Sequence, residues 1–248
     1  MTLHFAVIGG TGLDRLPGLQ ITERRTIRTP YGEPSGPVSV GELHGHRLAF
    51  LARHGEDHRI PPHKVNYRAN LWALHRIGVK RVMAVAAVGG ITPDMRPARL
   101  VFPDQVIDYT WGREHSFADG STEHVQHVDF THPYSPALRE RFIAAARALG
   151  LDAVEQGVYG ATQGPRLESI AEIRRMARDG CDIVGMTGMP EAGLARELGL
   201  DYACCAVVVN WAAGLGSGDI HAEIADCIEQ GMAGVRRLLE KLIPQLAV

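Results

Sequence analysis

The sequence predicts a single three-layer α/β domain, in which helices cover both faces of a central mixed β-sheet. Short apolar runs recur along the chain, and several are too continuously apolar for a sheet with one face in water. Segments with helical periodicity separate these runs, as in folds that alternate strands and helices. No composition break, internal repeat or low-complexity tract divides residues 1–248, so we expect one domain.

The first strand is expected in the run HFAVIG, close to the N-terminus. Five later runs share its apolar, β-branched character and end in glycine, proline or a polar residue, as strands do. The expected strands lie at residues 4–9, 47–52, 81–88, 100–108, 181–186 and 202–209.

Helices are expected between these strands. The first follows Pro61 and Pro62, because proline is tolerated in the first turn of a helix. A long segment at residues 109–133 has weak patterning and is rich in His, Asp, Gly and Ser, so we interpret it as an active-site or interface loop. The expected helices lie at residues 64–77, 135–149, 169–179, 189–198 and 219–242.

The composition favours a small-molecule partner. The 26 Lys and Arg nearly balance the 28 Asp and Glu, which provides no basic surface for nucleic acid or for a membrane. The N-terminus runs directly into the first strand, so no secretion signal is expected, and the uncharged stretch 202–218 is a poor membrane helix. We therefore expect a soluble, cytoplasmic protein.

The four cysteines show no C-x-x-C spacing. Cys204 and Cys205 are neighbours within an apolar strand pattern, which is typical of buried thiols. All four are expected to be reduced core residues.

The first candidate binding motif is IGGTGL at residues 8–13. Glycines directly after a strand let backbone N–H groups approach an anion, and Thr11 adds a hydroxyl. The motif is not a dinucleotide fingerprint, because Arg15 stands where the third glycine would be, and it is not a P-loop. A tight turn without a ligand is the alternative.

A second motif, LARHG at residues 51–55, places Arg53 and His54 at the end of an apolar strand. Ligands of α/β folds bind at this edge of the sheet, and arginine offers a fork of donors to phosphate. A surface arginine beside a capping histidine is the alternative. The spacing of His54, His58 and His63 fits no standard zinc signature, so no metal is expected.

Two further motifs lie at the starts of expected helices. QGPRLES places Glu168 where a helix dipole favours an acid, with or without a ligand. VGMTGMPE places Met186 and Thr187 after a strand, where a methionine would ordinarily belong to the core.

Asn210 is the unusual residue of the run AVVVNWAAG. Its amide offers two donors and one acceptor at the end of an otherwise apolar strand, and each must find a partner. Asn210 therefore either caps a turn or contacts a ligand.

Together these segments resemble the trimeric purine nucleoside phosphorylase and 5′-methylthioadenosine phosphorylase family over almost the whole chain. The resemblance implies phosphorolysis, in which inorganic phosphate displaces a purine from C1′ of a ribosyl group, with no other cofactor. The segments that carry it are, in order, GGTGL, TPYGEPS, LARHG, HKVNYRANLWAL, QGPRLES, MTGMPEAGLA and VVVNW.

The resemblance also implies roles for individual residues. Phosphate would be bound by Thr11, Arg53, His54 and Thr187, with help from the backbone of Ala86 and Ala87. Met186 would lie under the ribose, and His127 would reach the sugar pocket of a neighbouring subunit. A homotrimer with sites at its subunit interfaces is therefore expected.

The residues expected around the base differ from the methylthioadenosine branch. Asn210 and Ala212 replace two aspartates, and Leu167 replaces a phenylalanine that covers the base, while Ala86 and Gly185 replace a threonine and an asparagine. An amide can donate to N7 and to a 6-oxo oxygen, and Glu168 can accept from N1–H of a 6-oxopurine. Both residues favour hypoxanthine or guanine over adenine, and we expect Asn210, Glu168 and His54 to act in catalysis.

The 5′ substituent is the remaining choice. Similarity to the methylthioadenosine branch favours S-methyl-5′-thioinosine as substrate. His221 matches a histidine that binds the 5′-hydroxyl in ordinary purine nucleoside phosphorylases, so inosine or guanosine is the alternative, followed by methylthioadenosine. A nucleoside-binding module and a hydrolase that uses no phosphate are the alternatives from other classes.

Overall fold

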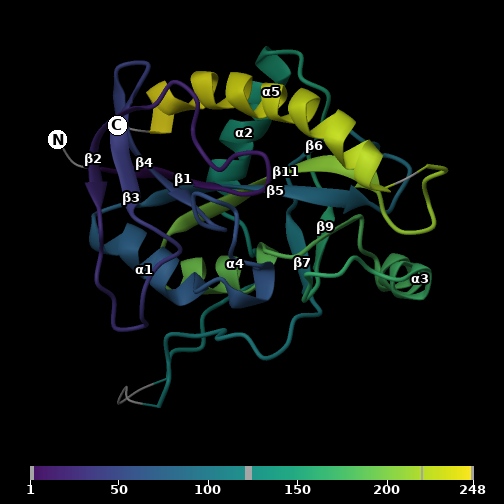
Figure 1. Ribbon diagram of the computed structural model, residues 1–248, viewed down its shortest axis with the longest axis horizontal. Coiled ribbons are helices and arrows are strands. Elements are labelled where there is room, and N and C mark those ends of the chain that lie inside the picture. Colours follow the sequence, from purple (N-terminus) through teal and green to yellow (C-terminus); the bar gives the residue numbers. More distant parts are fainter. Residues whose placement is uncertain (1–2, 121–124, 219, 247–248) are drawn as a thin grey trace.

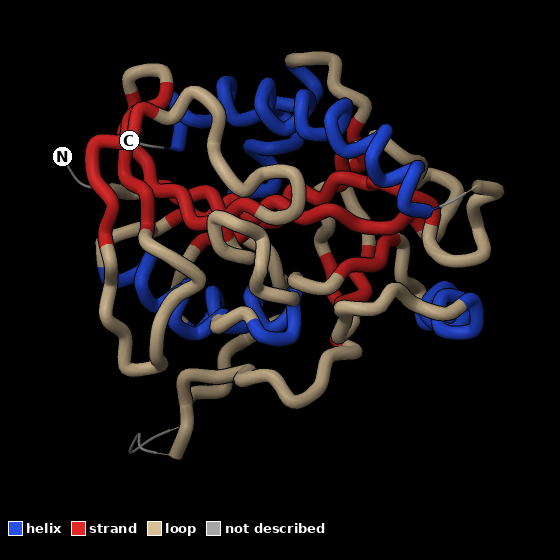
Figure 2. Tube along the Cα trace, viewed as in Figure 1, coloured by secondary structure: helices blue, strands red, loops and turns tan. Residues whose placement is uncertain are grey.

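The computed structural model describes residues 3–120, 125–218 and 220–246, and it has the expected three layers (Figure 1). Helices α2 (Pro136–Ala148) and α5 (Ile220–Leu246) cover one face of the sheet. Helices α1 (Tyr67–Arg76) and α4 (Gly188–Glu197) cover the other face (Figure 2). Helix α3 (Ile170–Asp179) lies apart from both layers, at one end of the molecule.

The sheet is mixed, as expected, and its strands follow the order β2-β3-β4-β1-β5-β10-β9-β7. Strand β1 is parallel to β4 and β5, whereas β10 is antiparallel to β5. Strand β11 pairs with β5 in parallel and also with β6, which in turn pairs with β8. The strands named here are β1 (Phe5–Gly9), β2 (Gln20–Arg25), β3 (Val38–Leu43), β4 (His46–Ala52), β5 (Arg81–Gly90), β6 (Leu100–Val101), β7 (Gln105–Asp108), β8 (Ala153–Val154), β9 (Val158–Ala161), β10 (Ile183–Gly185) and β11 (Asp201–Trp211).

Strand β5 is the branching point of the sheet. β11 pairs with one side of β5 over almost its whole length. On the other side, the pairing with β1 ends at Ala84, and the pairing with β10 begins at Gly89. Within the described chain, Val85–Val88 therefore has no strand partner on that side; we call this interval the β5 gap.

Two apolar cores follow from the alternation of side chains along the buried strands. In β11, Cys204, Ala206 and Val208 belong to the core on the α1 and α4 side. The intervening residues, Cys205 and Val207, belong to the core on the α2 and α5 side. The run that looked too apolar for a half-exposed strand is therefore buried on both faces.

The strand expected at residues 100–108 is wrong as a single element. It divides into β6 and β7 (Gln105–Asp108), separated by a segment that contains Pro103. Proline has no N–H to donate to a ladder, and the two halves pair with different strands, β11 and β9 (Val158–Ala161).

Helix boundaries shift where capping decides them. The helix expected from residue 64 begins at Tyr67, because the side chain of Asn66 caps it by accepting from the N–H of Ala69 at 3.0 Å. The preceding Pro62–Lys64 forms a short 3₁₀ helix, η1. The last helix continues past the expected end to Leu246.

No disulfide joins the four cysteines in the described chain, and the expectation of core positions holds for three of them. Cys181, Cys204 and Cys205 are buried, whereas Cys227 is half-buried. None of the helices in the described ranges combines the length and the apolar character needed to cross a membrane.

Candidate active site

A cavity of about 350 Å³ lies over the β5 gap, where β1, β4 and β10 end. It brings together residues that are far apart in the sequence and that end different strands. Most of the predicted site residues line it: Thr11, Arg53, His54, Ala86, Ala87, Leu167, Glu168, Met186, Thr187, Asn210 and Ala212.

Two predicted residues are not placed in the cavity. His127 lies exposed in the segment after residue 124 and is not among the lining residues. The backbone of His221 belongs to α5, but its side chain lies outside the described part of the structure. The neighbouring Ile220 and Ile224 line the cavity from the start of α5.

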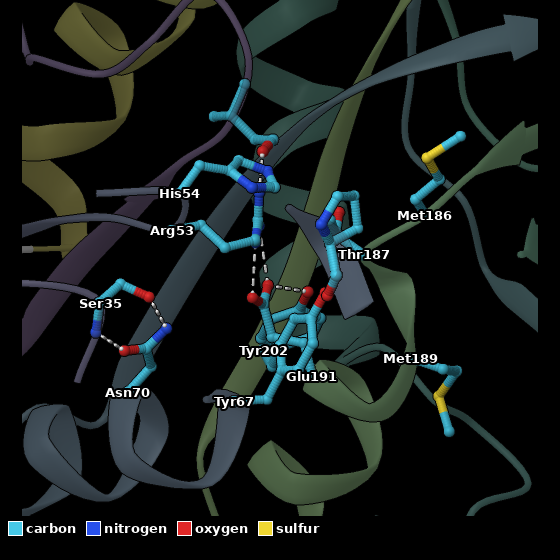
Figure 3. A network of polar contacts seen from close by, with 12 residues as sticks. Ser35, Arg53, His54, Tyr67, Asn70, Met186, Thr187, Met189, Glu191 and Tyr202 are labelled. Atoms are coloured by element: carbon cyan, nitrogen blue, oxygen red, sulfur yellow. Dashed lines mark hydrogen bonds and ion pairs between the residues drawn. The ribbon is translucent and has the colours of Figure 1, made fainter. Parts of the chain in front are cut away.

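Arg53 is buried and fully oriented by its neighbours (Figure 3). Its Nε and Nη2 donate to the two carboxylate oxygens of Glu191 at 2.7 and 2.8 Å. Its Nη1 donates to the Val85 carbonyl, at 2.9 Å, in the β5 gap. Glu191 therefore occupies the pair of Arg53 donors that was expected to bind phosphate. Of the five N–H groups of the guanidinium, two remain for a ligand.

Glu191 lies at the start of α4 and is as deeply buried as Arg53. Tyr202 donates its hydroxyl to Glu191 Oε1 at 2.8 Å. Burial opposes the charge of Arg53, but the adjacent carboxylate outweighs it and raises the pKa of the guanidinium. Arg53 therefore remains charged.

The sequence analysis did not identify Glu191 as a site residue. The available signal was a single charge within the segment MTGMPEAGLA. A carboxylate amid small and apolar residues is rarely buried without a cation.

Glycine is required at position 10 for Arg53 to reach the gap. A Cβ built on Gly10 would lie 2.5 Å from the Val85 carbonyl oxygen and 2.8 Å from Arg53 Nη1. Gly10, which was predicted to let backbone N–H groups approach an anion, thus also leaves room for the guanidinium of Arg53.

His54 is buried beside Arg53, and its Nδ1 lies 2.8 Å from the Ile60 carbonyl oxygen. A carbonyl can only accept, so Nδ1 carries the proton and Nε2 presents a lone pair. Burial, and then the charge of Arg53, lowers the pKa of His54 to about 4. His54 is therefore neutral at physiological pH.

His58 is a second lining residue that the sequence analysis did not assign to the ligand site. Its ring centroid lies 4.7 Å from that of His54. Its Nδ1 is 2.7 Å from Asp14 Oδ1, and its Nε2 is 3.5 Å from the Thr11 hydroxyl.

Within the described chain, no three His, Cys, Asp or Glu side chains are grouped to hold a metal ion.

Glu168 and Asn210 also line the cavity. Glu168 Oε1 accepts from the Thr162 hydroxyl at 2.6 Å. Asn210 Nδ2 donates to the Trp211 carbonyl at 2.7 Å, and the side chain is only 7% exposed. A β-bulge leaves Val209 without a register partner in β5, and both Val209 and Asn210 line the cavity.

Gly185 and Thr187, at the end of β10, also line the cavity. Tyr159 is buried and fills the place where a side chain at Gly185 would lie, since a Cβ there would be 2.1 Å from the Tyr159 hydroxyl. The N–H of Thr187 donates to the same hydroxyl at 3.4 Å. Thr187 is thus fixed at the entrance to α4.

Comparisons with known proteins agree with this geometry. The chain is 57% identical over 243 residues to a probable S-methyl-5′-thioinosine phosphorylase from Xanthomonas campestris, with 97% of each chain covered. It is 45% identical over 247 residues to a 6-oxopurine nucleoside phosphorylase from Pyrococcus furiosus, covering 97% of this chain and 92% of that one.

A solved structure supports the fold. A variant of the adenosine/methylthioadenosine phosphorylase from Schistosoma mansoni, in complex with adenine, aligns with a TM-score of 0.92 and 30% sequence identity. The alignment covers 99% of this chain and 91% of that one. Residues 4–244 also match the family profile described as the phosphorylase superfamily. The chain therefore belongs to the phosphorylase superfamily.

Proposed function

We propose that this chain catalyses the phosphorolysis of S-methyl-5′-thioinosine to hypoxanthine and 5-methylthioribose 1-phosphate, a purine-salvage reaction. The observation that carries the proposal is that Asn210 and Glu168 face one cavity with Thr11, Arg53 and His54. The cavity thus offers groups that suit a 6-oxopurine together with groups that suit an oxyanion. The relative from Xanthomonas campestris bears the name of this activity.

The reaction requires an anion and a leaving base on opposite sides of a sugar. Cleavage of the glycosidic bond develops oxocarbenium character at C1′ and negative charge on the departing purine. Phosphate is itself the nucleophile, so no serine or cysteine has to attack.

The β5 gap provides the phosphate end of the cavity. The Val85 carbonyl faces the gap, and because backbone groups alternate along a strand, the N–H of Ala87 faces the same way. Phosphate would accept from this N–H, from the Thr11 hydroxyl and from the two unoccupied N–H groups of Arg53. Neutral His54 would accept through Nε2 from a protonated phosphate oxygen, which fixes the orientation of the nucleophile.

Asn210 and Glu168 would bind the base. One N–H of Asn210 is engaged by Trp211, so a single N–H remains for the purine. Because the leaving group gains charge on its ring, we assign that donor to N7 rather than to O6. Glu168 Oε2 would accept from N1–H, while Oε1 is held by Thr162.

The 5′ substituent is proposed to be methylthio. Apolar side chains from the start of α5 and from residues 60–62 line one part of the cavity, next to Arg59; they are Ile60, Pro61, Pro62, Ile220 and Ile224. An apolar wall favours a thioether over a hydroxyl, which would lose its hydrogen bonds to water. Inosine or guanosine is the second candidate, supported by the 6-oxopurine nucleoside phosphorylase relative and by the predicted role of His221.

One assay tests the proposal. The protein is incubated with methylthioinosine, inosine or methylthioadenosine, with and without phosphate, and base release is followed. We expect release from methylthioinosine in phosphate only. Equal base release without phosphate would indicate a hydrolase. Faster release from inosine than from methylthioinosine would make inosine phosphorolysis the favoured activity. No release from any nucleoside would indicate a binding module.

The base assignment has its own test. Asn210→Asp should lose methylthioinosine activity, since a carboxylate would face an acceptor unless protonated. Adding Glu168→Ser should then raise the catalytic efficiency for methylthioadenosine relative to methylthioinosine, because the acceptor facing adenine N1 is removed. An unchanged ratio in the double variant would contradict the assignment.

A further inference from the structure

Arg113 lies outside the cavity, in the loop that follows β7, and half-buried between two segments that form the cavity. One segment follows β9 and contains Glu168; the other follows β10 and contains Met186 and Thr187. The loop is the weakly patterned one that the sequence analysis interpreted as an active-site or interface loop.

The guanidinium of Arg113 joins these two segments. On the β9 side, Nη2 donates to the carbonyls of Thr162 and Gln163 at 3.1 and 2.8 Å, and Nε donates to Gln163 Oε1 at 3.1 Å. On the β10 side, Nη1 donates to the carbonyls of Met186 and Met189 at 2.8 and 2.6 Å. Four main-chain carbonyls thus converge on one cation.

Tyr67 completes the surroundings of Arg113 from α1. Its hydroxyl accepts from Nη1 at 3.3 Å, and the guanidinium carbon lies 5.5 Å from the centre of its ring. No carboxylate of the described chain forms an ion pair with Arg113. The cation therefore stabilises the dipoles of four carbonyls that follow the ends of β9 and β10.

The segments held by Arg113 present the proposed base-binding and sugar-binding groups. Thr162, whose carbonyl binds Arg113, donates its hydroxyl to Glu168. Met186, whose carbonyl also binds Arg113, lines the cavity. A displacement of either segment would change the distance between Glu168 and the bound sugar.

We propose that Arg113 is a positioning residue that sets the separation between the base-binding segment 162–168 and the segment 186–189. The proposal rests on the proposed function, because it takes Glu168 as the base acceptor. Arg113 does not line the cavity, and we expect it to affect the base end more than the phosphate end, because Arg53 and His54 are held by other groups and Thr187 also donates its N–H to Tyr159.

The test compares Arg113→Met with a matched control, Arg139→Met. Arg139 also donates to carbonyls, those of Phe102, Pro103 and Glu155, but it lies away from the cavity. The measurements are the dissociation constant of hypoxanthine, the KM values for nucleoside and phosphate, and the thermal midpoint of each variant.

Arg113→Met should weaken hypoxanthine binding and raise the nucleoside KM by about 10- to 100-fold, as expected when a supporting group is displaced by a fraction of an ångström. The phosphate KM should change by less than about threefold, since the anion groups keep their own partners. Arg139→Met should lower the thermal midpoint without altering either constant.

A milder variant covers the case in which Arg113→Met does not fold. Gln163→Met removes the side-chain acceptor that Arg113 Nε shares with the N–H of Trp111, and it should weaken hypoxanthine binding about threefold. Unchanged hypoxanthine affinity in the folded variants, or equal changes in Arg113→Met and Arg139→Met, would overturn the proposal. A wild-type protein that binds no hypoxanthine would instead overturn the proposed function, and the role of Arg113 with it.

Discussion

At the scale of single residues, the site depends on a charge pair that has almost no contact with water. The side chains of Arg53 and Glu191 are each 1% exposed. Removing one member of a buried pair leaves the other charge unsolvated, which costs far more than losing a surface pair. Arg53 is therefore held in one orientation, whether or not an anion is bound.

Glu191→Gln should lower the free energy of unfolding by about 3–5 kcal/mol, because Arg53 would keep its charge without a carboxylate. Glu155→Gln is the control, since Glu155 forms a bidentate pair with Arg147 at the surface. Urea unfolding measures both variants, and we expect little change in the control. A similar loss in the two variants would show that burial of the Arg53–Glu191 pair is unimportant.

The depressed pKa of His54 predicts a dependence of stability on pH. Its folded pKa of about 4 lies below the ordinary value of 6.5, so the folded state favours neutral His54. This contribution is complete above pH 6.5 and is lost as the pH falls toward 4. At pH 5 the loss should be about 2 kcal/mol relative to pH 8.

Urea unfolding of the wild type and of His54→Gln at pH 5 and pH 8 checks this value. The variant should lack about 2 kcal/mol of the wild-type difference between the two pH values. Identical pH dependences would show that His54 does not titrate as its environment indicates.

The site was predictable from the sequence where a polar residue ends an apolar run. Arg53, His54, Thr187 and Asn210 all stand in this position and all reach the cavity. Glu191 was not predictable in the same way, because its partner is 138 positions away in the chain. Nor does the sequence reveal that Glu191 occupies the fork expected to bind phosphate.

At the scale of secondary structure, the strands with long apolar runs were predictable, and four other strands were not. β2 (Gln20–Arg25) reads QITERR and is mostly exposed, so it lacks the apolar run that marked the others. β3 (Val38–Leu43), β8 and β9 were also missed; β8 and β9 are short, with two and four residues. Such strands form because a neighbour supplies hydrogen bonds, which local sequence does not record.

Gly10, in the turn that follows β1, lies close to β5 and gives a prediction at the scale of secondary structure. Gly10→Ala should displace Arg53 from the β5 gap, because the added Cβ would meet both the Val85 carbonyl and the guanidinium. The phosphate KM should rise by about tenfold or more, since the displaced guanidinium is the proposed donor to the anion.

Gly36→Ala is the matched control for Gly10→Ala. A Cβ at Gly36 has no heavy atom within 4 Å. We expect its phosphate KM to stay at the wild-type value. Steady-state kinetics with varied phosphate compares the two, and a normal phosphate KM in Gly10→Ala would show that Arg53 does not bind the anion.

At the scale of the whole molecule, one predicted site residue lies on the surface of its own chain. His127 is exposed and is not part of the cavity of its own chain. We propose that it completes the site of a neighbouring subunit in a homotrimer, as the family resemblance implies. This chain would then need its copies for full activity.

Mixed oligomers test this arrangement. Asn210→Ala should inactivate the cavity of its own chain, whereas His127→Ala should impair only the neighbour's. Co-expressed with different tags, the two variants should form some sites with both residues intact, and activity should exceed the mean of the separate variants. Activity equal to that mean, or a mass by sedimentation equal to the 27.0 kDa chain, would contradict the shared site.

The β5 gap also has a thermodynamic consequence. Between Ala84 and Gly89, Arg53 pairs with the Val85 carbonyl, whereas no strand of the described sheet pairs with the N–H of Ala87 on that side. A phosphate that accepts from this N–H, as proposed, would stabilise the folded state. Its contribution to the free energy of unfolding would be about 2.7 kcal/mol at a phosphate concentration a hundred times the dissociation constant. The thermal midpoint should therefore be higher in phosphate than in an inert buffer of equal ionic strength, and the amide of Ala87 should exchange its hydrogen more slowly there.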